Sequence, residues 1–138
     1  MITLLTGTKG SGKTKKMLEM LDSALENSKG NVVCVEKQNS LSHNVSYRAR
    51  LISADEFSVC GFGPFFGFLS GLCAGNHDIT DIFVDATLRI GSRDMDELAD
   101  FIKKIDALAK MTETRFVFTV SADKENIPAD LFDLCDIA

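Results

Sequence analysis

The sequence lacks an excess of basic charge. Its 15 Lys and Arg residues are outnumbered by 20 Asp and Glu residues, which gives a formal net charge of -5 at pH 7. A protein that binds mainly by neutralising nucleic-acid phosphates needs a basic surface, so nucleic acid is not indicated as a partner. A local basic cluster remains, and it consists of Lys9, Lys13, Lys15 and Lys16.

The sequence also lacks paired cysteines and a secretion signal. Four cysteines are present, but no two of them form a C-x-x-C pair, so neither a zinc site nor a disulfide framework is suggested. Free thiols are typical of a reducing compartment. No basic segment precedes the first apolar run at Ile2 and no cleavage-site pattern follows it, so we expect a cytoplasmic protein.

The length and composition fit one folded domain. The chain has 138 residues, of which 45% are hydrophobic and 25% charged, close to the usage of an average globular protein. It contains no internal repeat and no low-complexity linker. We therefore expect a single domain over residues 1–138.

Strand-like runs alternate with helical patterns along the chain. The strand-like runs cover residues 2–6, 32–35, 79–84 and 115–121. Residues 51–53 form either a further strand or a connection. Apolar residues recur at helical spacing within 13–27 and after a capping sequence at Asp94, and Pro128 opens a short last helix. This alternation predicts an α/β fold with a mainly parallel sheet of four or five strands flanked by helices.

One segment carries a phosphate-binding pattern. Residues 7–14 match G-x-x-x-x-G-K-[ST] at every fixed position, and they stand between a strand and a helix as that mechanism requires. Glycines let the backbone bend around phosphates, and the positive end of the helix supports the anion. Lys13 is placed to bridge the outer phosphates, and the Thr14 hydroxyl to hold Mg²⁺. The predicted binding residues are Gly7, Thr8, Lys9, Gly10, Ser11, Gly12, Lys13 and Thr14.

With this motif the sequence resembles the P-loop NTPase superfamily. The resemblance implies a three-layer fold, a nucleoside triphosphate and Mg²⁺, and it places the strand at 116–120 between the P-loop strand and the strand that precedes Asp85. Asp85, which follows Ile82-Phe83-Val84, looks like the Walker B aspartate and would bind Mg²⁺ through water. ATP is the expected nucleotide, because the chain has no guanine-reading N-K-x-D motif.

The residue that would activate water is harder to assign. Many P-loop ATPases have Glu directly after the Walker B aspartate, where this chain has Ala86. By a second arrangement within the superfamily, Glu36 would orient the attacking water, although it could equally face solvent at a strand end. Ser121 resembles a sensor of the γ-phosphate or simply begins a loop. Four arginines are candidate phosphate-contacting fingers or solvated surface residues: Arg48, Arg50, Arg89 and Arg93.

The segment from Phe57 to Asn76 is uncharged and rich in glycine and phenylalanine. Its 20 residues reach the nominal length of a membrane span, but Pro64 is expected to begin the helix, which leaves about 12 residues, or ~18 Å. We expect a helix packed on the sheet, with an exposed partner or dimer surface as the alternative. One helical face carries the glycines spaced four apart, Gly63, Gly67, Gly71 and Gly75.

These observations lead to three functional hypotheses. The first is a small Mg²⁺-dependent ATPase or ATP switch that acts with a protein partner or as a homo-oligomer. The second is a nucleoside or nucleotide kinase of the thymidine-kinase-like kind, although no arginine-rich lid is visible in the sequence. The third is a module that binds ATP without hydrolysing it, and Ala86 in place of the usual glutamate motivates it.

Overall fold

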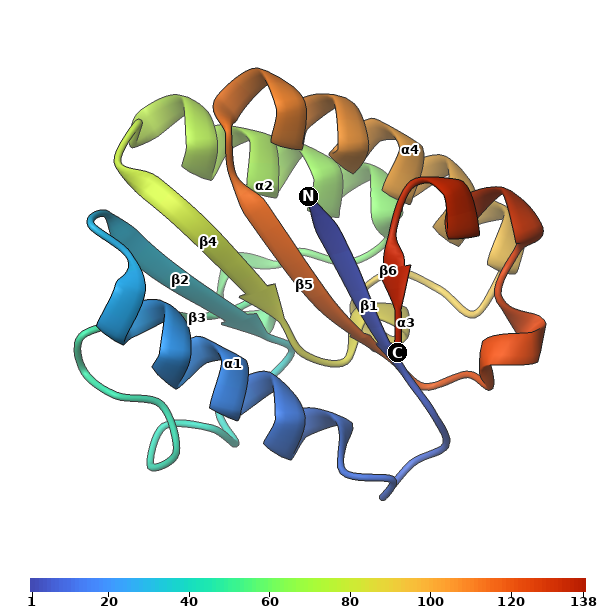
Figure 1. Ribbon diagram of the computed structural model, residues 1–138, viewed down its shortest axis with the longest axis horizontal. Helices are drawn as coiled ribbons and strands as arrows, with labels where there is room; N and C mark the ends of the chain where they lie inside the picture. The colour runs from blue at the N-terminus through green and yellow to red at the C-terminus, as the bar shows by residue number, and fades with distance from the viewer.

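The fold is a three-layer α/β arrangement around one parallel sheet, as a computed structural model of residues 1–138 shows (Figure 1). The sheet has the strand order β3-β2-β4-β5-β1-β6. Its strands are β1 (Ile2–Thr6), β2 (Asn31–Glu36), β3 (Arg50–Ser53), β4 (Ile79–Val84), β5 (Arg115–Val120) and β6 (Asp136–Ile137). The helices are α1 (Lys13–Asn27), α2 (Phe62–Gly75), α3 (Thr87–Ile90) and α4 (Met95–Thr112). Short 3₁₀ turns lie at Asp55–Phe57, Lys124–Asn126 and Ala129–Asp133.

The sheet is larger than the sequence predicted. It has six strands instead of four or five, and every pairing is parallel. The alternative of a strand at residues 51–53 is confirmed as the edge strand β3. The strand that was not predicted is β6, whose two residues are too few to show a period-two pattern. The predicted place of β5, between β1 and β4, is confirmed. At the far edge, Ala138 extends the β6 pairing by donating to the Leu4 carbonyl oxygen at 2.9 Å.

The two faces of the sheet bury different cores. Alternate strand residues point to opposite faces, and the positions Leu5, Cys34, Phe83 and Val117 pack with α1. The intervening positions pack with α2 and α4 in the larger core. Figure 1 shows the same division, with α1 on one side of the sheet and α2 and α4 on the other. This alternation decides which side chains can meet at the strand ends near α1.

Helix α2 packs on the sheet, as expected, but it starts earlier than Pro64. It begins at Phe62 after Gly61, whose φ of 91° turns the chain into the helix. Pro64 lies inside the first turn, where its missing N–H is not needed. The buried residue Phe65 stacks on Phe101 of α4 with ring centroids 5.3 Å apart. The same face of α2 also buries Phe62, Leu69 and Cys73.

The glycine face of α2 points away from the protein. A Cβ atom built on Gly63, Gly67, Gly71 or Gly75 would meet no atom within 4 Å. The glycines therefore do not serve close packing within this chain. No helix in the structure is both long enough and apolar enough to cross a bilayer.

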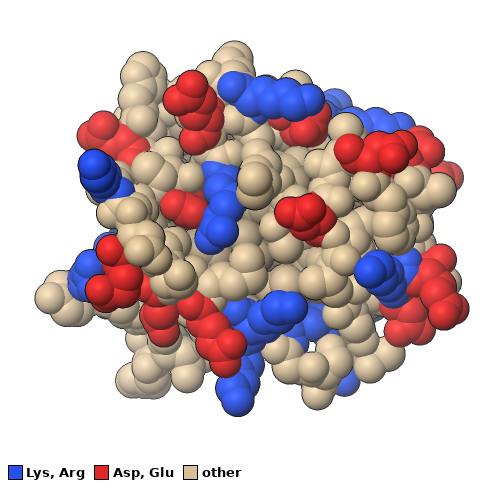
Figure 2. All heavy atoms as spheres, in the orientation of Figure 1, with Lys and Arg blue, Asp and Glu red and all other residues tan.

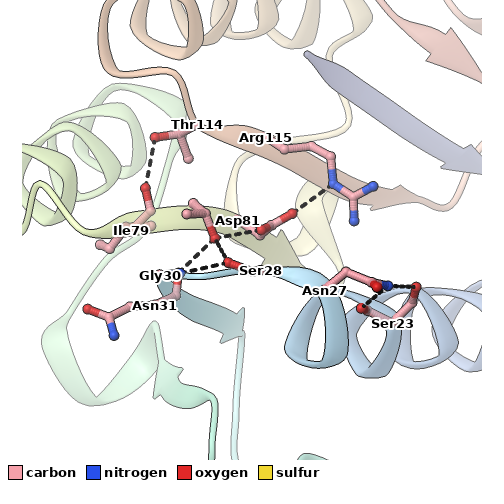
Figure 3. A network of polar contacts seen from close by, with 10 residues as sticks. Ser23, Asn27, Ser28, Gly30, Asn31, Ile79, Asp81, Thr114 and Arg115 are labelled. Carbon is pink, nitrogen blue, oxygen red and sulfur yellow. Dashed lines mark hydrogen bonds and ion pairs between the residues drawn. The ribbon is translucent and has the colours of Figure 1, made fainter.

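The strand ends opposite the glycine-rich loop carry a closed polar network (Figure 3). Asp81 of β4 accepts from Arg115 Nε of β5 at 2.8 Å and from the Thr80 hydroxyl at 2.7 Å. The Thr80 hydroxyl also contacts the hydroxyl of Ser28, which in turn accepts from the Gly30 N–H. The network joins the end of α1 to two strands, so its role is to hold these elements together.

Candidate functional site

The candidate site lies where the carboxyl ends of the strands meet the beginning of α1. In β4 and β5 the register pairs Asp81 with Arg115 and Phe83 with Val117, which brings Asp85 level with Thr119. The alternation of side chains turns both residues toward the α1 face. Glu36 follows Cys34 on the same face of β2. The fold therefore gathers polar side chains from three strands beside α1.

The glycine-rich loop is shaped by positive backbone angles. Gly7, Gly10 and Gly12 have φ values of 140°, 83° and 90°, which L side chains rarely adopt. A Cβ atom on Gly7 would also come within 2.5 Å of Ser11 Oγ. The loop is fixed at its start by the Gly7 N–H, which donates to the Ala122 carbonyl oxygen after β5 at 3.0 Å. These glycines are therefore required by the loop conformation.

The loop and the first turn of α1 present backbone donors without acceptors. The first hydrogen bond of the helix runs from the Lys16 N–H to the Gly12 carbonyl oxygen at 3.0 Å, and Gly12 provides no side-chain cap. No hydrogen bond in the structure uses the N–H groups of the residues just before Lys16. An uncapped helix start of this kind attracts anions. The free donors are the N–H groups of Gly12, Lys13, Thr14 and Lys15.

Lysines lie before, among and after these free donors in the chain. Lys13 folds back over the loop, and its ammonium group donates to the Thr8 carbonyl oxygen at 2.9 Å. Lys9, Lys15 and Lys16 are exposed. Figure 2 shows basic side chains gathered at the lower margin of the view, where Figure 1 places the loop and the start of α1. The site is therefore locally positive on a protein of net negative charge.

Asp85 lies at the centre of a small hydroxyl cluster. Its Oδ1 atom accepts from the Thr14 hydroxyl at 3.1 Å and from the Thr119 hydroxyl at 2.7 Å. Its backbone N–H donates to the Val35 carbonyl oxygen at 2.9 Å, which fixes the end of β4 against β2. No cation pairs with this carboxylate. The two residues that the motif assigned to the metal, Thr14 and Asp85, are thus in direct contact.

Glu36 is buried and already bound by its own chain. The residue is only 2% exposed, so the alternative of a solvent-facing Glu36 is wrong. Its Oε1 atom accepts from the N–H and the hydroxyl of Ser40 at 2.8 and 3.0 Å, and Leu41 donates to both carboxylate oxygens. These bonds anchor the loop between β2 and β3. A role for Glu36 in orienting water stays a prediction.

The sequence pointed to Ser121 and not to Thr119, which lies two residues earlier. Ser121 follows β5 and its hydroxyl makes no hydrogen bond in the structure, whereas Thr119 contacts Asp85 directly. Thr119 is the only polar residue between Phe116 and Val120, and strand alternation places it on the α1 face. This signal could have identified it. A sensor role for Ser121 stays a prediction.

The four candidate arginines lie in different surroundings. Arg48 donates to the Leu25 carbonyl oxygen at 2.9 Å and pairs with Glu26, so it is tied to the far end of α1. Arg50 begins β3 and lies at its exposed amino end. Arg89 on α3 and Arg93 after it are exposed and form no ion pair, and they follow Asp85 in the chain. Arg48 and Arg50 thus lie away from the carboxyl ends of the strands, and a phosphate contact by Arg89 or Arg93 stays a prediction.

Cys34 lies beneath the carboxylates of the site. Burial, together with the smaller effect of the negative charges of Asp85 and Glu36, raises the pKa of its thiol to about 12. The thiol is therefore neutral at physiological pH, and a neutral buried thiol is a poor nucleophile. Cys34 contributes packing to the site and no charge.

No family model matches this chain, and no curated protein matches it. The site therefore has to be interpreted from its own geometry.

Proposed function

We propose that this protein binds ATP together with Mg²⁺ at the glycine-rich loop, as a member of the P-loop NTPase superfamily would. The observation that carries the proposal is the group of unpaired N–H donors at the start of α1, next to the Lys13 ammonium and the contact between Thr14 and Asp85. Anion-binding donors and metal-binding oxygens lie within one short stretch of structure. A bound metal-phosphate group needs both.

The residues present fit a triphosphate. The positive φ angles turn the loop backbone, and nothing lies within 4 Å of a Cβ atom built on Gly10 or Gly12, so space remains above the loop. The free N–H groups would hold phosphate oxygens. The Lys13 ammonium group would leave the Thr8 carbonyl oxygen and donate to the phosphate oxygens instead. This exchange replaces a neutral acceptor with a charged one, which strengthens the hydrogen bond.

The residues present also fit Mg²⁺. The Thr14 hydroxyl and the Asp85 carboxylate offer the hard oxygen ligands that this ion prefers. A hydroxyl that donates its proton to Asp85 keeps lone pairs for a metal. When bound, the ion would neutralise phosphate charge. Asp85 would hold it from the side of the sheet.

The geometry supports slow or partner-dependent hydrolysis. Ala86 occupies the place after Asp85, and the carboxylate of Glu36 is engaged by Ser40 and Leu41. Neither position offers a free base beside the loop. An ATPase or ATP switch that works with a protein partner or a second copy would gain the missing group on assembly. A module that binds ATP without turnover is the second candidate, supported by the same contacts of Glu36.

Calorimetric titration of ATP with excess Mg²⁺ tests the proposal. We expect Lys13→Ala to weaken binding by roughly tenfold to a hundredfold, because a hydrogen bond to a charged group contributes about 1.5–3 kcal/mol. Lys29→Ala removes an exposed lysine beyond the opposite end of α1 and should change affinity only slightly. Equal affinity of the wild type and Lys13→Ala would reject the phosphate site. Phosphate release from the same samples separates an ATPase from a binding module.

A further inference from the structure

We propose that Thr119 is a positioning residue, which holds the Asp85 carboxylate in the orientation that the metal ion requires. This inference rests on the proposed function, because it concerns how the same site binds Mg²⁺. Thr119 lies on β5 and is only 2% exposed. Neither the phosphate-binding motif nor the aspartate after β4 points to it in the sequence.

The hydrogen bonds of Thr119 have a fixed direction. Its hydroxyl oxygen accepts from the Ala86 N–H at 2.8 Å, and a backbone N–H can only donate. The single proton of the hydroxyl is then free for Asp85 Oδ1, at 2.7 Å. The side chain thus bridges the backbone on one side of Asp85 and its carboxylate on the other. Such a bridge restricts the rotation of the carboxylate.

The two oxygens of Asp85 are left with different surroundings. Oδ1 accepts from both Thr14 and Thr119, whereas Oδ2 has no hydrogen bond within the chain. The hydroxyl of Thr119 therefore keeps one oxygen occupied and the other free. Groups that orient a metal-binding carboxylate in this way typically change metal affinity by about 10–100-fold when they are removed.

Thr119 also supports the turn that follows β4. Ala86 adopts a left-handed φ of 60°, which is unusual for alanine, and its N–H has Thr119 as its acceptor. Removing the hydroxyl would leave this donor unpaired, so some loss of stability is expected in addition to the change in metal binding. The experiment must therefore separate stability from metal affinity.

The test compares Thr119→Val, which keeps the shape of the side chain without its hydroxyl, with Thr119→Ser, which keeps the hydroxyl. ATP affinity is measured by calorimetry over a series of Mg²⁺ concentrations. We expect Thr119→Val to raise the half-saturating Mg²⁺ concentration by on the order of tenfold. Metal-free ATP affinity should change less than about twofold, and Thr119→Ser should restore the wild-type Mg²⁺ dependence. A merely structural role of Thr119 would not change the Mg²⁺ dependence selectively, and serine would not restore it.

Thr87→Val is the matched control. Thr87 is fully buried two residues after Asp85, and its hydroxyl has no partner. Removing the Thr87 hydroxyl should leave the Mg²⁺ dependence of ATP affinity unchanged. Melting curves without ligand report whether each variant folds, and Thr119→Ala replaces the valine variant if the latter does not.

The outcomes separate this inference from the proposed function. If the wild type needs Mg²⁺ for tight ATP binding and the folded hydroxyl-free variant has the same Mg²⁺ dependence, the role of Thr119 is refuted and the nucleotide site stands. If the wild type does not bind ATP at all, the proposed function itself fails. A selective loss of Mg²⁺ affinity that serine restores supports both.

Discussion

Two aspartates, one in β4 and one just after it, lie on the same face of the sheet and have different surroundings. At the amino end of β4 Asp81 pairs with Arg115, in its middle Phe83 lies opposite Val117, and beyond its carboxyl end Asp85 lies beside Thr119. The Arg115 guanidinium also lies 5.6 Å from the centre of the Phe83 ring. One aspartate is thus neutralised within the chain, and the other has only hydroxyl partners.

This difference separates a carboxylate that stabilises the fold from a carboxylate that remains available to a ligand. The charge of Asp81 is balanced by a protein cation, and its network closes on α1. Asp85 keeps a carboxylate oxygen without a partner, close to a helix start with unpaired N–H donors. In parallel α/β sheets, ligands bind beyond the carboxyl ends of the strands. The Asp85 end therefore suits a ligand, and the Asp81 end suits stability.

The largest expected effect is on metal binding by Asp85→Asn. The substitution removes the negative charge but keeps the shape, so the Mg²⁺ concentration needed for tight ATP binding should rise by on the order of tenfold to a hundredfold. The unfolding midpoint without ligand should stay close to that of the wild type. An unchanged Mg²⁺ dependence in calorimetry would show that Asp85 does not face the metal.

Asp81→Asn should produce the opposite pattern. Removing one partner of a buried ion pair costs about 3–5 kcal/mol, and we expect about 1–3 kcal/mol here because the Arg115 side chain is 34% exposed. Urea unfolding measures this loss, while ATP affinity should remain that of the wild type. If Asp81→Asn weakened ATP binding as much as Asp85→Asn, the division between the two ends of β4 would be wrong.

The same division applies to the exposed face of α2. Gly67 lies mid-helix with open space where a Cβ would stand, so folding does not require glycine there. Gly67→Ala should stabilise the protein by about 0.5–1 kcal/mol, because glycine is a poorer helix former than alanine. Gly7→Ala is the contrasting variant and should destabilise the loop, since Gly7 has a φ of 140°. Destabilisation by Gly67→Ala in urea unfolding would contradict an open glycine face.

The smallest expected effect is on the pH dependence of stability, and it concerns Cys135. Burial raises the pKa of the Cys135 thiol from 9.0 to about 12, with Asp106 and Asp136 adding to the rise and the Met1 amino group opposing it. The folded state therefore favours the neutral thiol. Its contribution is complete below pH 9 and is lost as the pH rises toward 12.

The difference in melting temperature between the wild type and Cys135→Ser tests this contribution. Measured with reductant present, it should be constant from pH 7 to about pH 9 and shift against the wild type above that range. A difference that stays constant up to pH 11 would show that the folded-state pKa of Cys135 is not raised.

Local patterns predicted part of this molecule well. The predicted strand at 79–84 and the predicted helix at 13–27 are both confirmed. They could be predicted because apolar runs and helical periodicity are local signals in the sequence. The loop residues 7–14 could be proposed as a site because the motif fixes their spacing. Asp85 could be assigned to the same site only because the resemblance to the P-loop NTPase superfamily implies an aspartate after a strand. Thr119 stands out in the sequence as the only polar residue between Phe116 and Val120. Its contact with Asp85 could not be predicted, since the two residues are 34 positions apart and meet only through the register of β4 and β5.

Other features depend on contacts that a sequence pattern does not encode. The burial of Glu36 follows from a loop that folds back to place Ser40 and Leu41 on its carboxylate. Strand β6 exists because two residues after an irregular segment reach the edge of β1. The outward direction of the glycine face depends on which side of α2 packs against the rest of the protein.

The most direct test of the central claim is a thermal-shift titration of the wild-type protein with ATP, with and without Mg²⁺. Binding to the folded state stabilises it by about 2.7 kcal/mol at a ligand concentration a hundredfold above Kd. We predict a concentration-dependent rise in melting temperature that is larger with Mg²⁺ and that in Lys13→Ala requires roughly tenfold to a hundredfold more ATP. No rise with any nucleoside triphosphate, at concentrations up to several millimolar, would contradict the proposed nucleotide site.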